Sequence, residues 1–132
     1  MDLTYSDEHE AFRQEVRAFL TRNKAAYPRP FGVNRPTPEA LAWRPMLIEN
    51  GYAARTIPRI YGGFGASPDI LASHIIAEEF ARARAPSGLV NQGISMLVPT
   101  LLEMGSEQQK ARWIAPTLRG EVIWCQGYSE PG

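Results

Sequence analysis

The chain has 132 residues, a typical length for one domain, and this is long enough to bury a hydrophobic core without disulfide bonds. Its 14 Lys and Arg residues balance 14 Asp and Glu residues, so the basic footprint of a nucleic-acid or anionic-membrane binder is absent. The single cysteine, Cys125, excludes an intrachain disulfide and a multi-cysteine metal site, and the acidic start and the lack of a long apolar run predict a soluble, cytoplasmic protein without a membrane span.

The first half of the sequence predicts two helices with clear start signals. Ser6 is a suitable N-cap, acidic residues follow it, and apolar residues recur at helical spacing over residues 12–20. Thr37 followed by Pro38 starts a second helix, because proline is favoured at the first helical position. Pro45 lies inside this second helix, so we expect the helix to be kinked or split there.

The second half of the sequence predicts three more helices. The run Ser67-Pro68-Asp69 opens the third in the same way as Thr37-Pro38-Glu39. Residues 89–104 are apolar almost all round, which is typical of a central, buried helix, and Pro99 predicts a kink or a boundary within it. Ser106 and Gln109 form a capping-box pattern that starts the last helix.

The last twelve residues differ from the helical part. Residues 122–125 are consecutively apolar, which predicts a strand buried on both faces, and residues 129–132 have the sequence of a turn. One strand cannot satisfy its own backbone hydrogen-bonding groups. We therefore predict an all-α domain over residues 1–120, an orthogonal or up-down bundle of about five helices. Residues 121–132 would be the first strand of a β domain that this sequence lacks.

The charged and polar side chains do not form a recognisable catalytic set. His74 and Glu78 are one helical turn apart, and a surface ion pair or hydrogen bond is favoured over a metal site because no third ligand is evident. Glu78 and Glu79 point about 100° apart on a helix and cannot act together on one bond, so solvated charge or a contact with Arg82 is favoured for them. We expect no catalytic residue within these 132 positions.

The C-terminal segment is the chemically suggestive part of the sequence. Unpaired backbone groups, the Ser129 hydroxyl and the flat rings of Trp124 and Tyr128 could meet a planar ligand with polar edges, such as an isoalloxazine ring. The same groups could meet a strand of another protein. For Trp124 alone, packing against the core is favoured over contact with a ligand.

Three blocks of sequence resemble one enzyme family. The run Gln126-Gly127-Tyr128-Ser129-Glu130-Pro131-Gly132 is similar to the opening of the signature of the acyl-CoA dehydrogenases, where a Gly-Ser-Asp run follows. Residues 58–65, with the helix that contains Ala77-Glu78-Glu79-Phe80, resemble the loop and third helix of the family's N-terminal domain. Residues 105–110 resemble the start of its fifth helix. The blocks occur in the family's order and together extend over essentially the whole chain.

The resemblance implies a flavoenzyme that converts an acyl-CoA thioester to a trans-2-enoyl-CoA. It implies an FAD cofactor, electron transfer to an electron-transferring flavoprotein, and assembly with a copy of the chain or a related subunit. Gln126, Tyr128 and Ser129 would lie along the flavin ring, with Ser129 as a hydrogen-bond donor, and Leu89, Gln92 and Met96 would line the acyl pocket. The catalytic glutamate of the family belongs to its C-terminal domain and would therefore lie beyond Gly132. Glu130 is part of the signature and is not that base.

The parts of the family pattern that are missing here limit the activity that we expect of this chain. Without the Gly-Ser-Asp run, the β domain and the base, these residues should neither retain FAD tightly nor oxidise a thioester. Two other functions stay open: a helical interaction module that binds a partner through its C-terminal strand by β-augmentation, and a bundle that binds an acyl chain with the helix over residues 89–104. The apolar surface left without neighbouring domains also predicts self-association.

Overall fold

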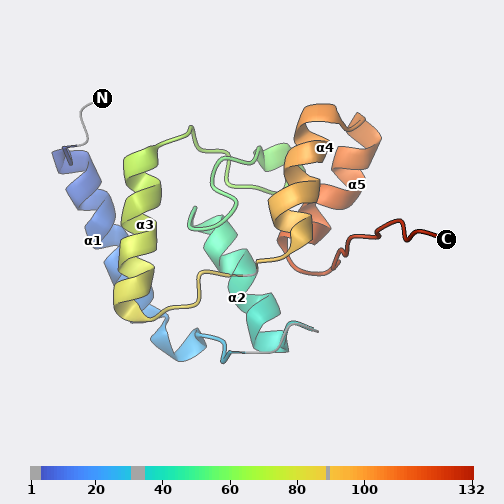
Figure 1. Cartoon of the computed structure of the whole chain (residues 1–132). Helices are drawn as coiled ribbons and strands as arrows, with labels where there is room; N and C mark the ends of the chain where they lie inside the picture. Colours follow the sequence, from blue (N-terminus) through green and yellow to red (C-terminus); the bar gives the residue numbers. More distant parts are fainter. Residues whose placement is uncertain (1–3, 31–34, 89) are drawn as a thin grey trace.

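The computed structural model describes residues 4–30, 35–88 and 90–132, and within these ranges the protein is all-helical (Figure 1). The prediction of an all-α domain is confirmed. The described residues contain five α-helices and no strand, and no helix among them is long and apolar enough to cross a membrane. The α-helices are α1 (Asp7–Arg22), α2 (Pro38–Glu49), α3 (Ile70–Ala83), α4 (Val98–Met104) and α5 (Glu107–Leu118); the short elements are the 3-10 turns η1 (Lys24–Ala26) and η2 (Arg59–Tyr61) and the π-helical turn η3 (Gly93–Leu97).

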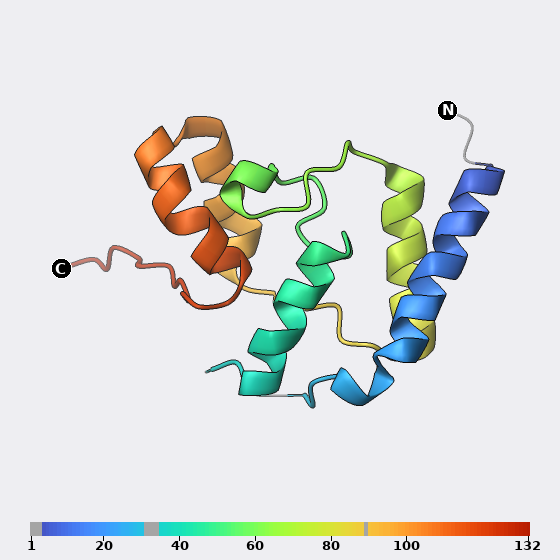
Figure 2. The ribbon, with the colours of Figure 1, turned by 180° about the vertical axis from the view of Figure 1, so that it is seen from behind.

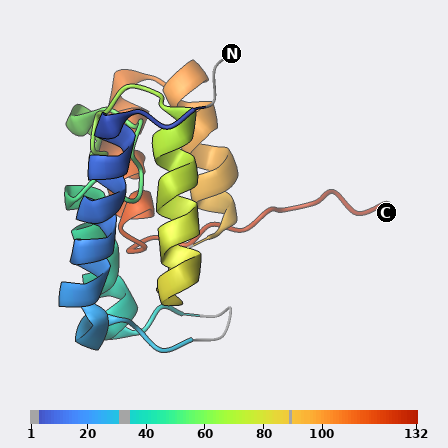
Figure 3. The same ribbon diagram turned by 90° about the vertical axis from the view of Figure 1, so that its left-hand side faces the viewer.

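The helices form two pairs with α2 between them. α1 and α3 run side by side in the same direction (Figures 1 and 3), and α4 and α5 pack against each other at the other end of the molecule. The reverse view in Figure 2 shows α2 between these pairs. His9 of α1 lies 3.2 Å from the carboxylate of Asp69, which joins the amino ends of α1 and α3.

The start signals of the helices are confirmed with one exception. The side chains of Ser6, Thr37 and Ser106 each accept a hydrogen bond from the backbone N–H three residues later, at 3.2–3.3 Å. The predicted start of the third helix at residues 67–69 is wrong by two residues. Asp69 is itself the N-cap, because its carboxylate accepts the N–H of Ala72 at 3.0 Å and α3 begins at Ile70.

The prolines predicted to lie inside helices affect the helices differently. Pro45 does not split the second helix, since α2 is continuous from Pro38 to Glu49. Pro116 likewise lies within α5, in its last turn, where few backbone bonds depend on it. Pro99 marks a boundary, as predicted: the π-helical turn ends at Leu97 and Pro99 occupies the first turn of α4.

The core lies between the two helix pairs and is rich in aromatic rings. Phe19 of α1 lies 5.8 Å from Trp43 of α2 and 4.9 Å from Tyr52, and Tyr52 lies 6.1 Å from Phe80 of α3, measured between ring centroids. The indole N–H of Trp43 donates to the carbonyl of Pro86 at 2.8 Å. This bond attaches the segment between α3 and η3 to the middle of the core. That segment leads directly into the candidate site.

The prediction of a helix within residues 89–104 is confirmed over residues 92–104, which are helical without a break, but the prediction that this helix is central and buried is wrong. Position 89 lies outside the described residues, and η3 and α4 lie at one side of the molecule (Figure 1). Val90 and Met104 are 88% and 81% exposed, whereas Gly93 and Val98 are buried. The described elements therefore cover one side of this apolar stretch and leave the other side open.

Residues 121–132, which we call the tail, do not form the predicted strand and turn. They run away from the helices as an extended segment (Figure 1). Among the described residues, the last backbone hydrogen bond joins the N–H of Glu121 to the carbonyl of Pro116 at 3.0 Å. A strand requires a paired ladder, and no backbone hydrogen bond joins residues 122–132 to another described segment.

Candidate functional site

A groove forms where the tail passes over η3 and the start of α4. It has a volume of about 210 Å³. We call it the tail groove. It is lined by Gln92, Met96, Leu97, Thr100, Trp124, Cys125 and Gln126.

The wall formed by residues 92–97 has its shape because the helix there is wider than an α-helix. The N–H of Val98 bonds to the carbonyl of Gly93, five residues back, which is the π-helical pattern. The side chain of Asn91 accepts the N–H of Ile94 at 3.2 Å and so starts this turn. Pro99 has no N–H to contribute to the turn. Single π-helical turns of this kind occur frequently at functional sites.

Trp124 attaches the opposite wall, the tail, to α5. Its indole N–H donates to the Thr117 hydroxyl at 2.9 Å, and its ring meets Trp113 edge-on at a centroid distance of 5.2 Å. The Thr117 hydroxyl in turn donates to the carbonyl of Trp113 at 2.6 Å. Trp124 therefore packs against α5, but the expectation that it packs against the core is not confirmed, because it is half-buried and lies outside the core cluster.

Gln126 joins the two walls of the groove through its amide. Its oxygen accepts hydrogen bonds from the Gln92 side chain at 3.1 Å and from the Tyr128 hydroxyl at 2.6 Å. Its NH₂ group contacts the sulfur of Met96 at 3.7 Å. Gln126 and Tyr128 are residues for which the resemblance implies contact with a cofactor, and Gln92 and Met96 are residues for which it implies contact with a substrate. The structure brings the two sets together.

Two sequence-based candidates remain. Leu89 lies outside the described residues. Ser129 is exposed and does not line the groove. Sequence reasoning missed Leu97, Thr100 and Cys125 as lining residues. The helical spacing of Met96 and Thr100 could have indicated that these two share a face, and the Thr100 hydroxyl indeed donates to the carbonyl of Met96 at 2.8 Å.

The side chains of the tail groove favour binding over acid–base chemistry. Thioether, aliphatic, indole and amide groups line it, and no carboxylate or imidazole is among its lining residues. A flat ring could stack on such a surface while its polar edge meets backbone groups of the tail. This set of groups fits one flank of an isoalloxazine ring. Among the lining side chains the Cys125 thiol can ionise, and the others offer no base for removing a proton from carbon.

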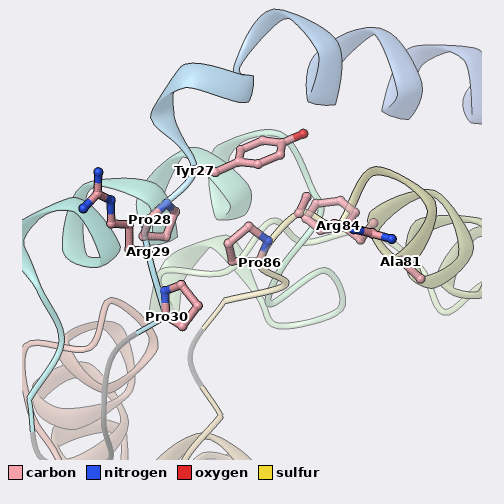
Figure 4. A pocket seen from close by; sticks show the side chains of 9 residues that line it. Tyr27, Pro28, Arg29, Pro30, Ala81, Arg84 and Pro86 are labelled. Atoms are coloured by element: carbon pink, nitrogen blue, oxygen red, sulfur yellow. The ribbon is translucent and has the colours of Figure 1, made fainter.

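A larger pocket of about 530 Å³ lies at the C-terminal end of α3, between residues 27–30 and residues 80–86 (Figure 4). Its walls are mainly proline, alanine and the ring of Phe80. The Tyr27 hydroxyl donates to the carbonyl of Leu20 at 2.8 Å and is thereby occupied, and Arg29 and Arg84 lie on opposite sides in Figure 4. No residue that the sequence singled out lines this pocket, so the tail groove is the better candidate.

Glu78 and Glu79, the neighbouring acidic residues of α3, are both paired with arginine. Glu79 is buried and accepts hydrogen bonds from Arg17 at 2.8 Å, Arg82 at 2.9 Å and Arg13 at 3.1 Å. The predicted contact with Arg82 is present, but the prediction of a solvated Glu79 is wrong. The hydrogen bonds from Arg17, followed by those from the other two arginines, lower the pKa of Glu79 to about 2. A carboxylate held so firmly in its charged form is a poor proton acceptor at neutral pH.

The other candidate pair on this helix makes the predicted surface contact. His74 and Glu78 lie 3.0 Å apart on an exposed face. No group of three or more potential metal ligands occurs among residues 4–30, 35–88 and 90–132. The pair therefore has no third described ligand with which to hold a metal ion.

Comparison with known proteins points to one family. The family description "Acyl-CoA dehydrogenase, N-terminal domain" matches residues 6–121. Acyl-CoA dehydrogenase IpdE1 of Mycobacterium tuberculosis is 37% identical over 133 residues, covering 93% of this chain and 33% of that protein. The mitochondrial short-chain specific acyl-CoA dehydrogenase of Mus musculus is 33% identical over 127 residues, covering 96% of this chain and 30% of that protein.

Solved structures show the same relationship. The ChsE4-ChsE5 complex from Mycobacterium tuberculosis matches 100% of this chain and 33% of the matched chain, with a TM-score of 0.62 and 27% identity. Tcur3481-Tcur3483, described as a steroid ACAD, matches with the same TM-score and identity over 34% of its chain. This chain spans about a third of the length of these relatives. The chain therefore belongs to the acyl-CoA dehydrogenase family and has the fold of that family's N-terminal domain.

Proposed function

We propose that these residues form the N-terminal part of an FAD-dependent acyl-CoA dehydrogenase that converts an acyl-CoA thioester to a trans-2-enoyl-CoA. The observation that carries the proposal is the amide of Gln126, which contacts both Gln92 and Met96. Residues implied in cofactor contact thus meet residues implied in substrate contact at one groove. In this proposal residues 1–120 are the helical domain and residues 121–132 begin the following β domain.

The roles of individual residues follow from this placement. Gln126, Tyr128 and Ser129 would hold one flank of the flavin, whose isoalloxazine ring supplies hydride acceptance when bound. Gln92 and Met96, with Leu89, would border the acyl group. None of these side chains removes the α-proton, because none is a base of suitable strength. That base, and the surfaces that exclude water from the reaction, would come from the parts of the relatives that this chain does not span.

The binding part of the proposal can be tested on the chain as it is. In a ¹⁵N NMR titration with FAD, we expect weak, saturable shifts at the backbone amides of residues 126–129 and the side-chain amide of Gln92. AMP, which lacks the ring, is the control ligand and should leave these signals in place. Unchanged amides at residues 126–129 in millimolar FAD would contradict the assignment. The purified chain itself should be colourless and should not reduce a dye with any acyl-CoA.

The catalytic part requires a complete enzyme. Replacing the matching N-terminal third of IpdE1 with this chain should give a yellow protein that retains activity, and exchanging Gln126 for Ala in that chimera should weaken flavin retention. The acyl-CoA panel should include a steroid-derived thioester, because one structural relative is described as a steroid ACAD. A folded chimera without flavin would contradict the proposal. We further propose that the complete enzyme is cytoplasmic, passes electrons to an electron-transferring flavoprotein, and assembles with a copy or a related subunit.

A second candidate function is favoured by the unpaired backbone of the tail. An extended segment with free N–H and C=O groups can add to the edge of a partner's sheet by β-augmentation. In that case the chain would act as a helical interaction module. The coding sequence after Gly132 distinguishes the two functions: a Gly-Ser-Asp run and a long downstream reading frame support the enzyme, whereas a stop codon supports the module.

A further inference from the structure

Trp124 attaches the tail to α5 by a hydrogen bond to Thr117 and a ring contact with Trp113. Thr117, which holds its N–H, is completely buried. Because the Thr117 hydroxyl donates its proton to the Trp113 carbonyl at 2.6 Å, it is left to accept the indole N–H at 2.9 Å. The orientation of the indole is therefore fixed by a chain of two hydrogen bonds that starts on the backbone of α5.

The edge of the indole that carries its N–H also lies against Gly93 in the π-helical turn, because Cδ1, the ring atom bonded to the nitrogen, is the atom nearest to this glycine. A Cβ atom at position 93 would lie 2.4 Å from Cδ1 of Trp124 and 2.8 Å from Cγ2 of Thr117, both far inside van der Waals contact. Gly93 does not have a positive φ. Its backbone conformation is therefore one that alanine can adopt, and the glycine is required there by the space that Trp124 occupies.

The two residues after Trp124 line the tail groove. Cys125 lies directly next to Trp124 in the chain, and the Gln126 amide makes the contacts to Gln92 and Met96 at 3.1 and 3.7 Å. These contacts depend on how closely the tail approaches η3. That approach is set where the indole edge meets both Gly93 and Thr117.

We propose that Trp124 and Gly93 are positioning residues: the indole, lying in the space that Gly93 leaves free, holds Gln126 in register with Gln92 and Met96. Neither residue needs to touch a ligand in this role. The inference rests on the proposed function for one point, the role of Gln126 at the flavin. The positioning of Gln126 is a property of the chain itself and is measurable without a flavin.

The test is Gly93→Ala, compared with Gly127→Ala as the matched control. The control adds the same methyl group to the tail at a glycine whose Cβ would meet no atom within 4 Å. We expect the nuclear Overhauser contact between the Met96 methyl group and the Gln126 side-chain amide to be lost in Gly93→Ala and kept in Gly127→Ala. The indole N–H resonance of Trp124, assigned from its disappearance in Trp124→Phe, should shift in Gly93→Ala only.

Trp124→Ala provides a second variant if Gly93→Ala fails to fold, because Trp124 is half-buried and lies outside the helices. It should also lose the contact between Met96 and Gln126 while the thermal midpoint stays near that of the unchanged chain. Retention of this contact in a folded Gly93→Ala or in Trp124→Ala would overturn the positioning role. Loss of the contact in the variants, together with no response of the unchanged chain to FAD, would leave the positioning role standing and refute the proposed flavin site.

Discussion

Glu79 shows how one side chain joins two helices that are distant in sequence. It is 1% exposed and lies on α3, while two of its three arginine partners, Arg13 and Arg17, lie on α1. A buried carboxylate is costly unless it is paired and hydrogen-bonded, and here the guanidinium groups satisfy both oxygens. The same arrangement raises the pKa of Arg13 above its ordinary value, chiefly through its hydrogen bonds to Glu78 and Glu79.

Replacing Glu79 with glutamine should destabilise the chain by about 1–3 kcal/mol, because three arginines lose a charged acceptor in a buried setting. The matched control is Glu78→Gln on the neighbouring position, whose side chain is 43% exposed and whose pairs with Arg13 and His74 are screened by solvent. Its effect should be below about 1 kcal/mol. Urea unfolding followed by circular dichroism measures both; equal effects would refute the special role of Glu79.

The pH dependence of stability, compared between the unchanged chain and Glu79→Gln, tests the role of Glu79 independently. The folded-state pKa of Glu79 is about 2, below the ordinary value of 4.5, so its contribution is fully present above about pH 5 and is lost as the pH falls toward 2. The difference in stability between the unchanged chain and Glu79→Gln should therefore shrink over this acidic window. A difference that stays constant from neutral pH to pH 2 would contradict the assigned pKa.

At the scale of elements, the helix ends were largely predictable because capping chemistry is local. Ser6, Thr37 and Ser106 each need only their own sequence neighbours to cap a helix. The start of α3 was not predicted correctly, because Ser67 and Asp69 are both good caps and proline is compatible with either start. Asp69 also pairs with His9 of α1, a contact between distant residues that local sequence does not reveal.

Exchanging Asp69 for alanine should therefore cost about 1 kcal/mol, the typical value of a lost N-cap. Ser67→Ala, two residues earlier, is the matched control and should change the stability by no more than about 0.5 kcal/mol. Thermal or urea unfolding distinguishes the two. A larger loss in Ser67→Ala than in Asp69→Ala would mean that the helix begins where the sequence alone suggested.

The π-helical turn is the element that sequence reasoning could not find. In this turn Asn91 accepts the N–H of Ile94 and Gly93 lies against Trp124. The contact with Trp124 joins residues distant in sequence, so no local pattern reveals it. The apolar composition of residues 89–104 predicted burial, but the described elements bury only one side of this stretch. Composition does not say which polypeptide covers them, and the inference of a central helix failed for that reason.

At the scale of the whole molecule, large apolar side chains remain exposed on the side that carries α4 and the tail. Val90 and Met104 are almost fully exposed, Met96 and Ile123 about half so. Exposed apolar side chains of this kind are where a contact with another polypeptide would form. The candidate groove opens on this same side, between the tail and η3.

We expect the isolated chain to self-associate through this surface as its concentration rises. Met104→Lys should weaken the association, whereas Ile70→Lys should not, since Ile70 begins α3 at the opposite end of the molecule (Figure 1). Sedimentation equilibrium or light scattering over a concentration series measures the effect. A chain that stays monomeric at high concentration, or one that responds equally to both variants, would contradict the expectation.

The candidate site was predictable only in part. The identity of Gln92, Met96, Gln126 and Tyr128 came from the family resemblance, and their proximity came from the structure. Residue patterns alone predicted that Trp124 is packed, but they did not reveal that it packs against Trp113 and Thr117. The groove is formed by residues about 30 positions apart, and such pairings follow from tertiary packing rather than from periodicity.

The bond between Trp124 and Thr117 closes a loop of only seven residues. Short loops close at small entropic cost and on fast timescales, so this link can form as soon as the end of α5 is helical. The direction in which the polypeptide leaves the helices is then settled early, before any distant strand has to find it. In the proposed complete enzyme, the sheet of the following β domain would begin from a segment whose course is already decided, which reduces the search that slow non-local pairing otherwise requires.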